Sequence, residues 1–387
     1  MSGLRLTPIE MLAKLVSFDT ESAKSNLPLL DFVEAYLRSW SVPVVRVPNA
    51  EGDKAALFAT VGPQDRGGVL LSGHTDVVPV TGQEWTSDPF RLRVEGGRIF
   101  GRGTVDMKGF DALALALVPE FQAANLKTPI HIMLSYDEET TCLGVVDAIR
   151  RFGADLPMPR AVIVGEPTEL AVVDAHKSVV TFLTTVRGFE AHSAKPHLGA
   201  SAVMTAAELV SELNRIADEL MERGDPDQRF DPPYSTVHVG TIHGGTARNI
   251  MAKNCSFHWE FRGLPSLDPA EIPTRLERFA DDVALKRLNR FGNFGRIENA
   301  LEVSVPGLAP QPGSEAEALA MRLTGTNRSE TVPFGTEAGH YQAAGIPTIV
   351  CGPGSIDQAH QPDEYITVEQ IEAGAAFMRR LAAACAD

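Results

Sequence analysis

HIMLSYDEETTC, residues 131–142, is an apolar run with the character of a buried strand that ends in Asp137, Glu138 and Glu139. Adjacent carboxylates repel one another and raise each other's pKa unless a positive charge lies among them. An isolated acidic run is usually a solvated turn. At the end of a buried strand the same run can instead bind a cation, and the remaining sequence has to separate these two interpretations.

Segments of the same apolar kind recur on both sides of this strand. The runs at 55–62, 67–74 and 160–167 are strand-like, and helix-like segments at 7–18, 27–40 and 111–124 alternate with them. Strands that alternate with helices predict an α/β fold, in which helices cover both faces of a sheet.

The pattern changes near residue 178. Strand-like runs at 179–188, 235–245, 254–263 and 300–307 are separated by long amphipathic segments at 199–223 and 268–291. This βαββαβ order is that of a ferredoxin-like module. We therefore expect a discontinuous domain of residues 1–177 and 306–387, interrupted by an inserted domain of residues 178–305.

Composition limits the classes of function. The chain has 387 residues, of which 44% are hydrophobic, and a formal net charge of −15, which argues against a nucleic-acid partner. Its four cysteines form no C-x-x-C pair, which argues against a zinc finger or a thioredoxin-like motif, and so few scattered cysteines fit a reducing compartment. Because we find no signal peptide and no apolar run of about 18 residues, we expect a cytoplasmic protein without a membrane partner.

Potential metal ligands follow several of the predicted strands. In an open α/β sheet such loops converge outside the carboxyl ends of the strands. Two imidazoles and several carboxylates together suit zinc or another divalent ion. The candidates are His74, Asp76, Asp106, Glu138, Glu139, Glu166 and His360.

Seven motifs together resemble the M20 family of metal-dependent amidohydrolases and, within it, the acetylornithine deacetylases. They are SGHTDVVP, GRGTVDMKG, DEETTCLG, GEPT, GFEAHSAKPHLGASA, GGTARNIMA and CGPGSIDQAHQPDEY, and they span nearly the whole chain. The resemblance implies a zinc-peptidase-like catalytic domain with a mixed sheet, and a ferredoxin-like insertion that serves as lid and dimerisation domain.

The resemblance also implies a centre of two zinc ions per subunit, for which cobalt can substitute. His74 and Glu166 would bind one metal, Glu139 and His360 the other, and Asp106 would bridge them. Metals in such sites lie about 3.5–4 Å apart.

Two further carboxylates have expected roles beside the metals. Asp76 lies two residues after His74, on the same side of an extended chain, so it can hold the second imidazole nitrogen. Glu138 would be the general base that takes a proton from a metal-bridging water. The resemblance further implies a cis peptide between Asp106 and Met107. Asp137 has no assigned role beyond that of a turn residue.

The expected substrate contacts come mainly from the insertion. The resemblance implies a homodimer formed through residues 178–305, in which His192 polarises the scissile carbonyl in the partner's site. Asn249 and Arg262 are the candidates for the substrate carboxylate, and the role of Arg248 stays open. Glu337 is a candidate reader of a substrate ammonium group, with a helix N-terminal acid as the alternative.

The implied activity is hydrolysis of the amide bond of a small acylated amino acid. The resemblance favours N-acetyl-L-ornithine, which would give L-ornithine and acetate in arginine biosynthesis. A related enzyme acting on succinyl-diaminopimelate or acetyl-citrulline is the first alternative, and a metal-binding homologue without catalysis is the second. The presence of Glu138 argues against the second alternative.

Overall fold

The computed structural model describes residues 3–387 and divides into two units. The first unit contains the residues up to Ala175 together with Pro310–Glu330 and Thr336–Asp387. The second unit contains His176–Ala309 and Thr331–Gly335. The second unit thus includes a few residues on either side of the 178–305 insertion, and a short segment from much later in the chain.

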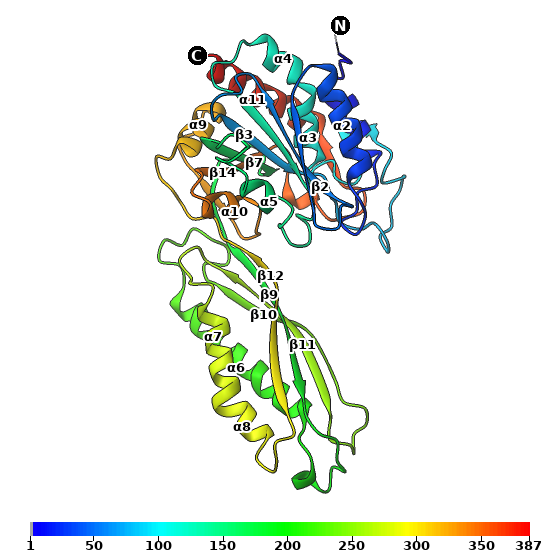
Figure 1. Cartoon of the computed structure of the whole chain (residues 1–387), viewed down its shortest axis with the longest axis vertical. Helices are drawn as coiled ribbons and strands as arrows, with labels where there is room; N and C mark the ends of the chain where they lie inside the picture. The colour runs from blue at the N-terminus through cyan, green and yellow to red at the C-terminus, as the bar shows by residue number, and fades with distance from the viewer. Residues whose placement is uncertain (1–2) are drawn as a thin grey trace. The chain divides into compact units, whose positions relative to one another are not determined.

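An eight-stranded mixed sheet forms the centre of the first unit (Figure 1). Its central neighbours β6, β3, β7 and β14 are parallel, so their carboxyl ends lie at one edge of the sheet. In spatial order the strands are β1 (Val44–Pro48), β2 (Ala55–Val61), β6 (Ile130–Ser135), β3 (Val69–His74), β7 (Ala161–Pro167), β14 (Thr348–Gly352), β8 (Val173–His176) and β13 (Glu330–Val332).

Helices pack on both faces of this sheet. Successive strand residues point to opposite sides, so each face presents side chains against which helices can pack. Leu71 and Ile132 belong to the large apolar core on the main helical side. Ser72 faces the other side, where its hydroxyl lies 2.8 Å from that of Tyr341. The main layer contains α1 (Pro8–Val16), α2 (Leu27–Ser39), α3 (Lys108–Ala116), α4 (Val118–Ala123), α9 (Glu315–Thr324) and α11 (Val368–Ala386), and the other side carries α5 (Val146–Ile149) and α10 (Ala338–Ala343).

Local signals set several helix boundaries. Thr7 and Glu10 form the predicted capping box at the start of α1. The helix predicted over 111–124 is in fact two helices, since α3 ends at Ala116 and α4 carries Pro119 in its first turn. Proline has no N–H and clashes with the preceding turn, so it favours a new helix start at this point.

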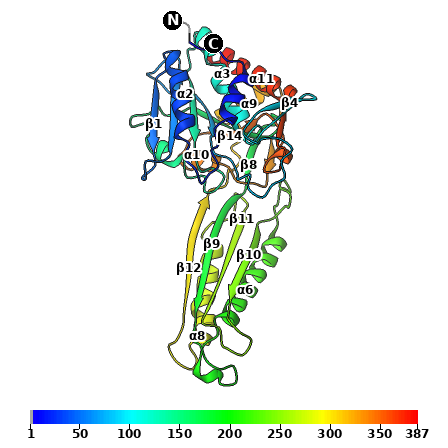
Figure 2. The ribbon, with the colours of Figure 1, turned by 90° about the vertical axis from the view of Figure 1, so that its right-hand side faces the viewer.

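The second unit has the predicted βαββαβ order. Figure 2 shows its antiparallel sheet with β12, β9, β11 and β10 side by side. These strands are β9 (Ser178–Arg187), β10 (Thr236–Gly244), β11 (Asn254–Gly263) and β12 (Arg296–Val305). In the isolated chain β10 and β12 are therefore the two edge strands.

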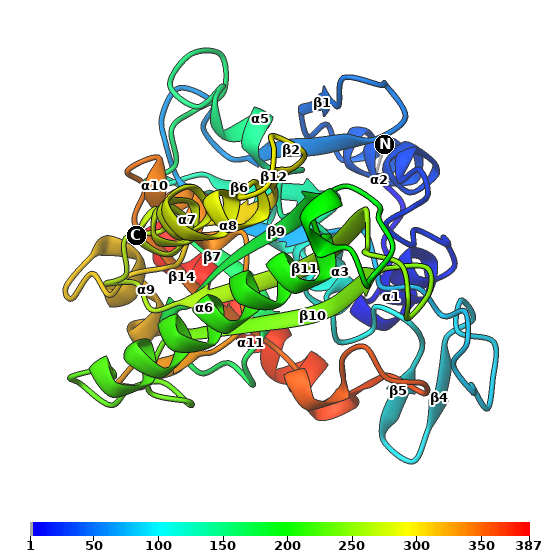
Figure 3. The ribbon, with the colours of Figure 1, turned by 90° about the horizontal axis from the view of Figure 1, so that it is seen from below.

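Helices cover one face of the second sheet, and Figure 3 shows α6 and α7 running over it. They are α6 (Ala202–Arg223), α7 (Glu271–Phe279) and α8 (Leu285–Leu288), with a π-helical turn at Ala280–Ala284. Alternate residues of β11, Phe257, Trp259 and Phe261, are buried in this core. The ring of Trp259 stacks on Phe182 at 4.5 Å between centroids.

A small three-stranded sheet of β4 (Arg93–Glu95), β5 (Arg98–Phe100) and β15 (Tyr365–Thr367) completes the first unit. It pairs the chain before Asp106 with the chain after His360. Among residues 3–387, no helix combines the length and the apolar character that a membrane crossing requires.

Candidate metal centre

The predicted ligands gather at the carboxyl edge of the parallel strands. His74 is the last residue of β3, and Glu166 lies near the end of β7. Glu138 and Glu139 follow β6, and His360 follows β14 and a short 3-10 turn, Ile356–Gln358. Because β3, β6, β7 and β14 are parallel neighbours, their ends bring residues together that are up to 286 positions apart (360 − 74).

Asp106 lies at the middle of this cluster. Its Oδ1 is 3.1 Å from Nε2 of His74, and its Oδ2 is 3.1 Å from Nε2 of His360. Glu139 Oε2 is 2.9 Å from the same nitrogen of His360, and Glu166 Oε1 is 3.8 Å from Nε2 of His74. The Asp106 carboxylate thus contacts both histidines, one through each oxygen. The predicted cis peptide after Asp106 is confirmed.

The electrostatics of the cluster fit a bound cation. Burial, together with the charge of Asp106, raises the pKa of Glu139 to about 8 and the pKa of Glu166 well above its usual value. Both side chains have a buried Oε1 without a hydrogen-bond partner. A divalent cation would offer these oxygens a partner and offset the mutual repulsion that raises the pKa values. Within residues 3–387, His74, Asp106 and Glu139 form one group of donor atoms in ligating range of one another.

Glu138 lies beside the proposed ligands and is also close enough to join them. Its Oε2 is 3.9 Å from Nε2 of His74, and it forms a second ligand-like group with His74 and Glu166. Burial and the nearby Asp106 and Asp76 carboxylates raise the pKa of Glu138 to about 7. A carboxylate with this pKa can accept and return a proton near neutral pH.

Asp76 makes more contacts than its spacing from His74 predicted. The closest partner of His74 Nδ1 is the backbone oxygen of Asp76 at 2.9 Å, and the Asp76 carboxylate is 3.5 Å away. That carboxylate accepts the N–H groups of Glu138 at 3.1 Å and Glu139 at 3.3 Å, and the Ser22 hydroxyl at 2.7 Å. Asp76 therefore orients the turn that carries both glutamates as well as the imidazole.

Two contacts around this turn were not predicted. Asp137 has a positive φ of 57° and pairs with Lys54, a residue that no motif singles out. The buried thiol of Cys142 donates to Oε1 of Glu138 at 3.3 Å. The spacing of four residues between Glu138 and Cys142 in DEETTC was the available signal for the second contact.

Glu337 is buried in the first unit, with 1% of its surface exposed. It directly precedes α10, but its side chain makes no capping hydrogen bond, and the Ala338 N–H is capped by the Thr336 hydroxyl at 3.0 Å. Its Oε1 has no partner. Burial and the charge of Glu138 raise the pKa of Glu337 well above its usual value. Glu337 does stand at the N-terminus of α10, so the alternative of a helix N-terminal acid stays open beside the role of an ammonium reader.

The other predicted substrate residues belong to the second unit. His192 and Asn249 lie on adjacent segments, since His192 forms a β-bridge with Ile250 and the Ser193 N–H donates to the backbone carbonyl oxygen of Asn249 at 3.0 Å. Both segments lie past the end of the sheet where Arg187 pairs with Asn254.

Arg262 lies at the other end of the same sheet. It pairs with Val179, close to where the chain enters the second unit, and its guanidinium contacts Glu260 at 3.1 Å. Eight strand residues separate Arg262 from Asn254 (262 − 254), or about 26 Å at the usual rise of a β-strand.

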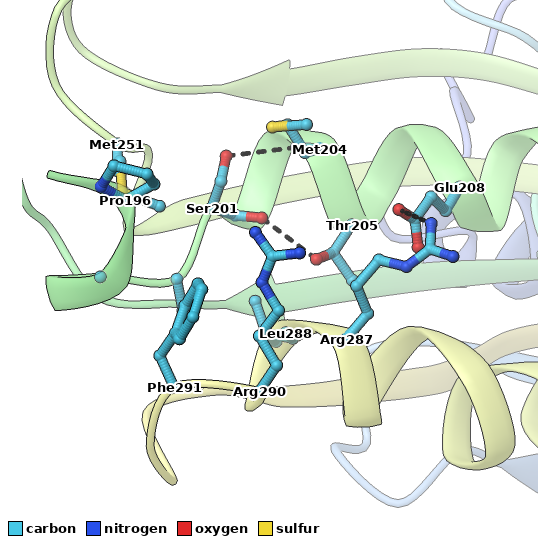
Figure 4. A pocket seen from close by; sticks show the side chains of 12 residues that line it. Pro196, Ser201, Met204, Thr205, Glu208, Met251, Arg287, Leu288, Arg290 and Phe291 are labelled. Atoms are coloured by element: carbon cyan, nitrogen blue, oxygen red, sulfur yellow. Dashed lines mark hydrogen bonds and ion pairs between the residues drawn. The ribbon is translucent and has the colours of Figure 1, made fainter. Parts of the chain in front are cut away.

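A pocket of about 130 Å³ in the second unit contains none of the predicted site residues (Figure 4). It lies where the loop after His192 meets the start of α6. Ser201 caps α6 through the Met204 N–H at 3.4 Å, and Glu208 pairs with Arg287 at 2.7 Å across the pocket.

Comparison with known proteins agrees with the geometry. The profile of Peptidase family M20/M25/M40 matches residues 70–384. The acetylornithine deacetylase of Myxococcus xanthus is 35% identical to this chain over 382 residues, which is 96% of each protein.

Solved structures share the fold at low sequence identity. The M20 family metallo-carboxypeptidase Sso-CP2 of Sulfolobus solfataricus aligns with a TM-score of 0.76 at 17% identity, over 98% of this chain and 99% of that one. The Bacillus subtilis YXEP protein, a dinuclear metal-binding peptidase of the M20 family, aligns with a TM-score of 0.65 at 17% identity, over 97% and 98%. With most of its length matched by the family profile and a relative at 35% identity, the chain belongs to the M20 family and is a metal-dependent hydrolase.

Proposed function

We propose that this enzyme hydrolyses the amide bond of N-acetyl-L-ornithine to L-ornithine and acetate, with zinc as the metal. The observation that carries the proposal is the position of Asp106, whose two oxygens each lie 3.1 Å from a different histidine, beside Glu138, whose side chain is 10% exposed. The substrate is supported by the 35% identity to an acetylornithine deacetylase over 96% of both chains.

The five proposed ligands would bind two metal ions. His74 and Glu166 would hold one metal, Glu139 and His360 the other, and Asp106 would be shared. Imidazole and carboxylate donors are common zinc ligands, and cobalt accepts the same set. When bound, such metals act as Lewis acids that polarise a carbonyl group and lower the pKa of water.

Glu138 would carry the proton through the reaction. It takes the proton from water as the water oxygen adds to the acetyl carbon, and it delivers that proton to the amide nitrogen as the C–N bond breaks. Two contacts orient the Glu138 carboxylate. The Asp76 carboxylate accepts the Glu138 N–H at 3.1 Å, and the Cys142 thiol donates to Glu138 Oε1 at 3.3 Å.

We also propose that the working enzyme is a homodimer formed through residues 178–305. Strands β10 and β12 are edge strands of the isolated second unit, and unpaired edges favour association. Exposed apolar side chains accompany both edges, Ile242 on β10 and Leu301 on β12. The segments of His192 and Asn249 lie about 26 Å from Arg262 along the same sheet, so these residues of one chain are too far apart to contact one small substrate together. We propose that His192 serves the partner's site.

A substrate panel tests the assignment directly. Zinc- and cobalt-loaded enzyme should be compared on N-acetyl-L-ornithine, N-succinyl-diaminopimelate and N-acetyl-L-citrulline, with kcat/KM as the measurement. The highest kcat/KM is expected for acetyl-ornithine. A higher value for either other substrate would reassign the activity within the family, and no hydrolysis of any of them would contradict the proposal.

The buried Glu337 is proposed to recognise the terminal ammonium of the substrate. Its Oε1 lacks a hydrogen-bond partner, and its carboxyl group is close enough to Glu138 for that charge to raise its pKa. An ammonium group would provide the missing partner and favour the ionised carboxylate.

Glu337→Gln is expected to lower kcat/KM for acetyl-ornithine by about 10- to 100-fold, the worth of a hydrogen bond to a charged group. Acetyl-norvaline serves as the control substrate, because it has the same aliphatic chain without the amine. Its kcat/KM should change much less. Equal losses on both substrates, or no loss on either, would show that Glu337 does not recognise the ammonium.

A further inference from the structure

The loop of residues 83–86 contacts the turn that carries His360. The Gln83 side-chain amide donates to the His360 carbonyl oxygen at 2.8 Å. Three residues on, the Thr86 N–H and hydroxyl both donate to Oδ1 of Asp363, at 3.1 and 2.9 Å. Both His360 and Asp363 have a positive φ, of 62° and 55°, a conformation that these residues adopt only when the surroundings hold them in it.

The orientation of the Gln83 amide is determined by its other partners. Its Oε1 accepts the indole N–H of Trp85 at 3.1 Å and an N–H of the Arg102 guanidinium. Both partners can only donate, so the carboxamide oxygen has to face them and the NH₂ group has to face the carbonyl of His360.

Arg102 connects this contact to the loop of Asp106. Its guanidinium pairs with Glu364 at 2.8 Å, and each side chain is only 1% exposed. The Glu364 carboxylate accepts the backbone N–H groups of Gly103 at 3.0 Å, Val105 at 2.9 Å and Asp106 at 3.2 Å. A continuous chain of hydrogen bonds therefore runs from the backbone of Asp106 to the backbone of His360.

His360 depends on this support more than the other proposed ligands do. Its side chain is 53% exposed, whereas those of His74, Asp106, Glu139 and Glu166 are 7% exposed or less. A ligand on an exposed loop is held in place mainly by hydrogen bonds to its backbone, because little packing restrains it.

We infer that Gln83 is a positioning residue for His360, and that the affinity of the metal held by His360 and Glu139 depends on it. The inference rests on the proposed two-metal centre. The hydrogen bond of Gln83 reaches the backbone of His360 and not its imidazole, so we expect Gln83 to act on metal affinity, and we expect saturating metal to restore turnover.

Two substitutions of Gln83 separate the role of its NH₂ group as donor to His360 from the role of its oxygen as acceptor for Arg102 and Trp85. Gln83→Glu retains an oxygen for Arg102 and Trp85 but has no N–H for the carbonyl of His360. Gln83→Met removes both functions without adding charge. The extra negative charge of Gln83→Glu favours a cation, so any loss of metal affinity in this variant is a lower bound on the effect of the donor.

The experiment is titration of the metal-free full-length protein with Zn²⁺ against a chromophoric chelator, repeated with Co²⁺ and its visible absorption. Wild type is expected to bind two ions per subunit. In both Gln83 variants one Kd should rise about 10- to 100-fold, while the other changes less than about threefold. Activity at limiting Zn²⁺ should fall, and excess Zn²⁺ should restore it.

Gln64→Glu is the matched control. Gln64 also donates from its amide to a backbone carbonyl, that of Gly62 at 3.0 Å, but it follows the end of β2 remote from the metal cluster. This variant should bind both ions like wild type, and the Tm of all metal-free variants should stay within about 2 °C of wild type.

Several outcomes would overturn the inference. Unchanged Kd values in both Gln83 variants, or equal weakening of both ions, would exclude a role in positioning His360. Weakening in Gln83→Met alone would assign the effect to Arg102 instead. Failure of wild type to bind two ions would overturn the proposed metal centre itself, a result distinguishable from failure of Gln83 alone.

Discussion

Glu138→Gln and Glu138→Ala are expected to retain two metal ions per subunit while kcat falls by about 10²- to 10⁴-fold, the usual contribution of general acid–base catalysis. The reason is the division of roles along the acidic run. Glu139 approaches His360 at 2.9 Å, whereas Glu138 Oε2 lies 3.9 Å from His74 and is the carboxylate left to move a proton.

The structure makes this a discriminating experiment, because Glu138 also lies within ligating range alongside His74 and Glu166. Metal content and kcat should be measured on the same preparations. Glu139→Gln is the matched control, one residue along the chain, and it should lose one ion. Near-full activity of Glu138→Ala would exclude the role of base, and loss of an ion from Glu138→Gln would make Glu138 a ligand instead.

His192→Ala is expected to lower kcat by about 10²- to 10³-fold, the usual effect of removing a donor that stabilises the developing oxyanion. KM should change less, since the contact strengthens as the reaction proceeds. His197→Ala, in the same exposed loop, is the control and should behave like wild type. Sedimentation should report a dimer for all three proteins. An active monomer at micromolar concentration would contradict the dimer proposal, and an unchanged kcat in His192→Ala would contradict the role of the histidine.

Mixed dimers test whether His192 acts on the partner's site. After co-refolding of Glu138→Ala with His192→Ala, half of the dimers should contain one chain of each kind. In these dimers one site combines an intact Glu138 with an intact His192 from the partner, so activity should recover to about a quarter of wild type. If His192 serves its own subunit instead, every site stays defective and no activity returns.

The sequence predicted the architecture well where periodicity is long and strong. The βαββαβ order of the second unit is present, and α6 and β11 occupy nearly the predicted ranges. The division of residues 111–124 into two helices was not predicted, although Pro119 was the available signal. The π-helical turn at Ala280–Ala284 carries no local sequence signal, because it depends on how the helix packs against its sheet.

The candidate metal centre also has a part that the sequence predicted and a part that only the tertiary structure shows. Histidines and carboxylates that follow apolar strands could be assigned to one site from the sequence, because parallel strands bring their carboxyl ends to one edge. His74, Asp106, Glu139, Glu166 and His360 do meet there.

The contacts that aim these side chains are decided only by the tertiary structure. Lys54 pairs with Asp137 across 83 positions, and Gln83 reaches the carbonyl of His360 across 277. The sequence by itself shows which residue types follow the apolar strands, and the α/β topology brings the ends of parallel strands to one edge, so the sequence was enough to predict which side chains collect there. Hydrogen bonds between loops distant in the chain depend on backbone conformations, such as the positive φ of His360, that exist only once both loops are packed.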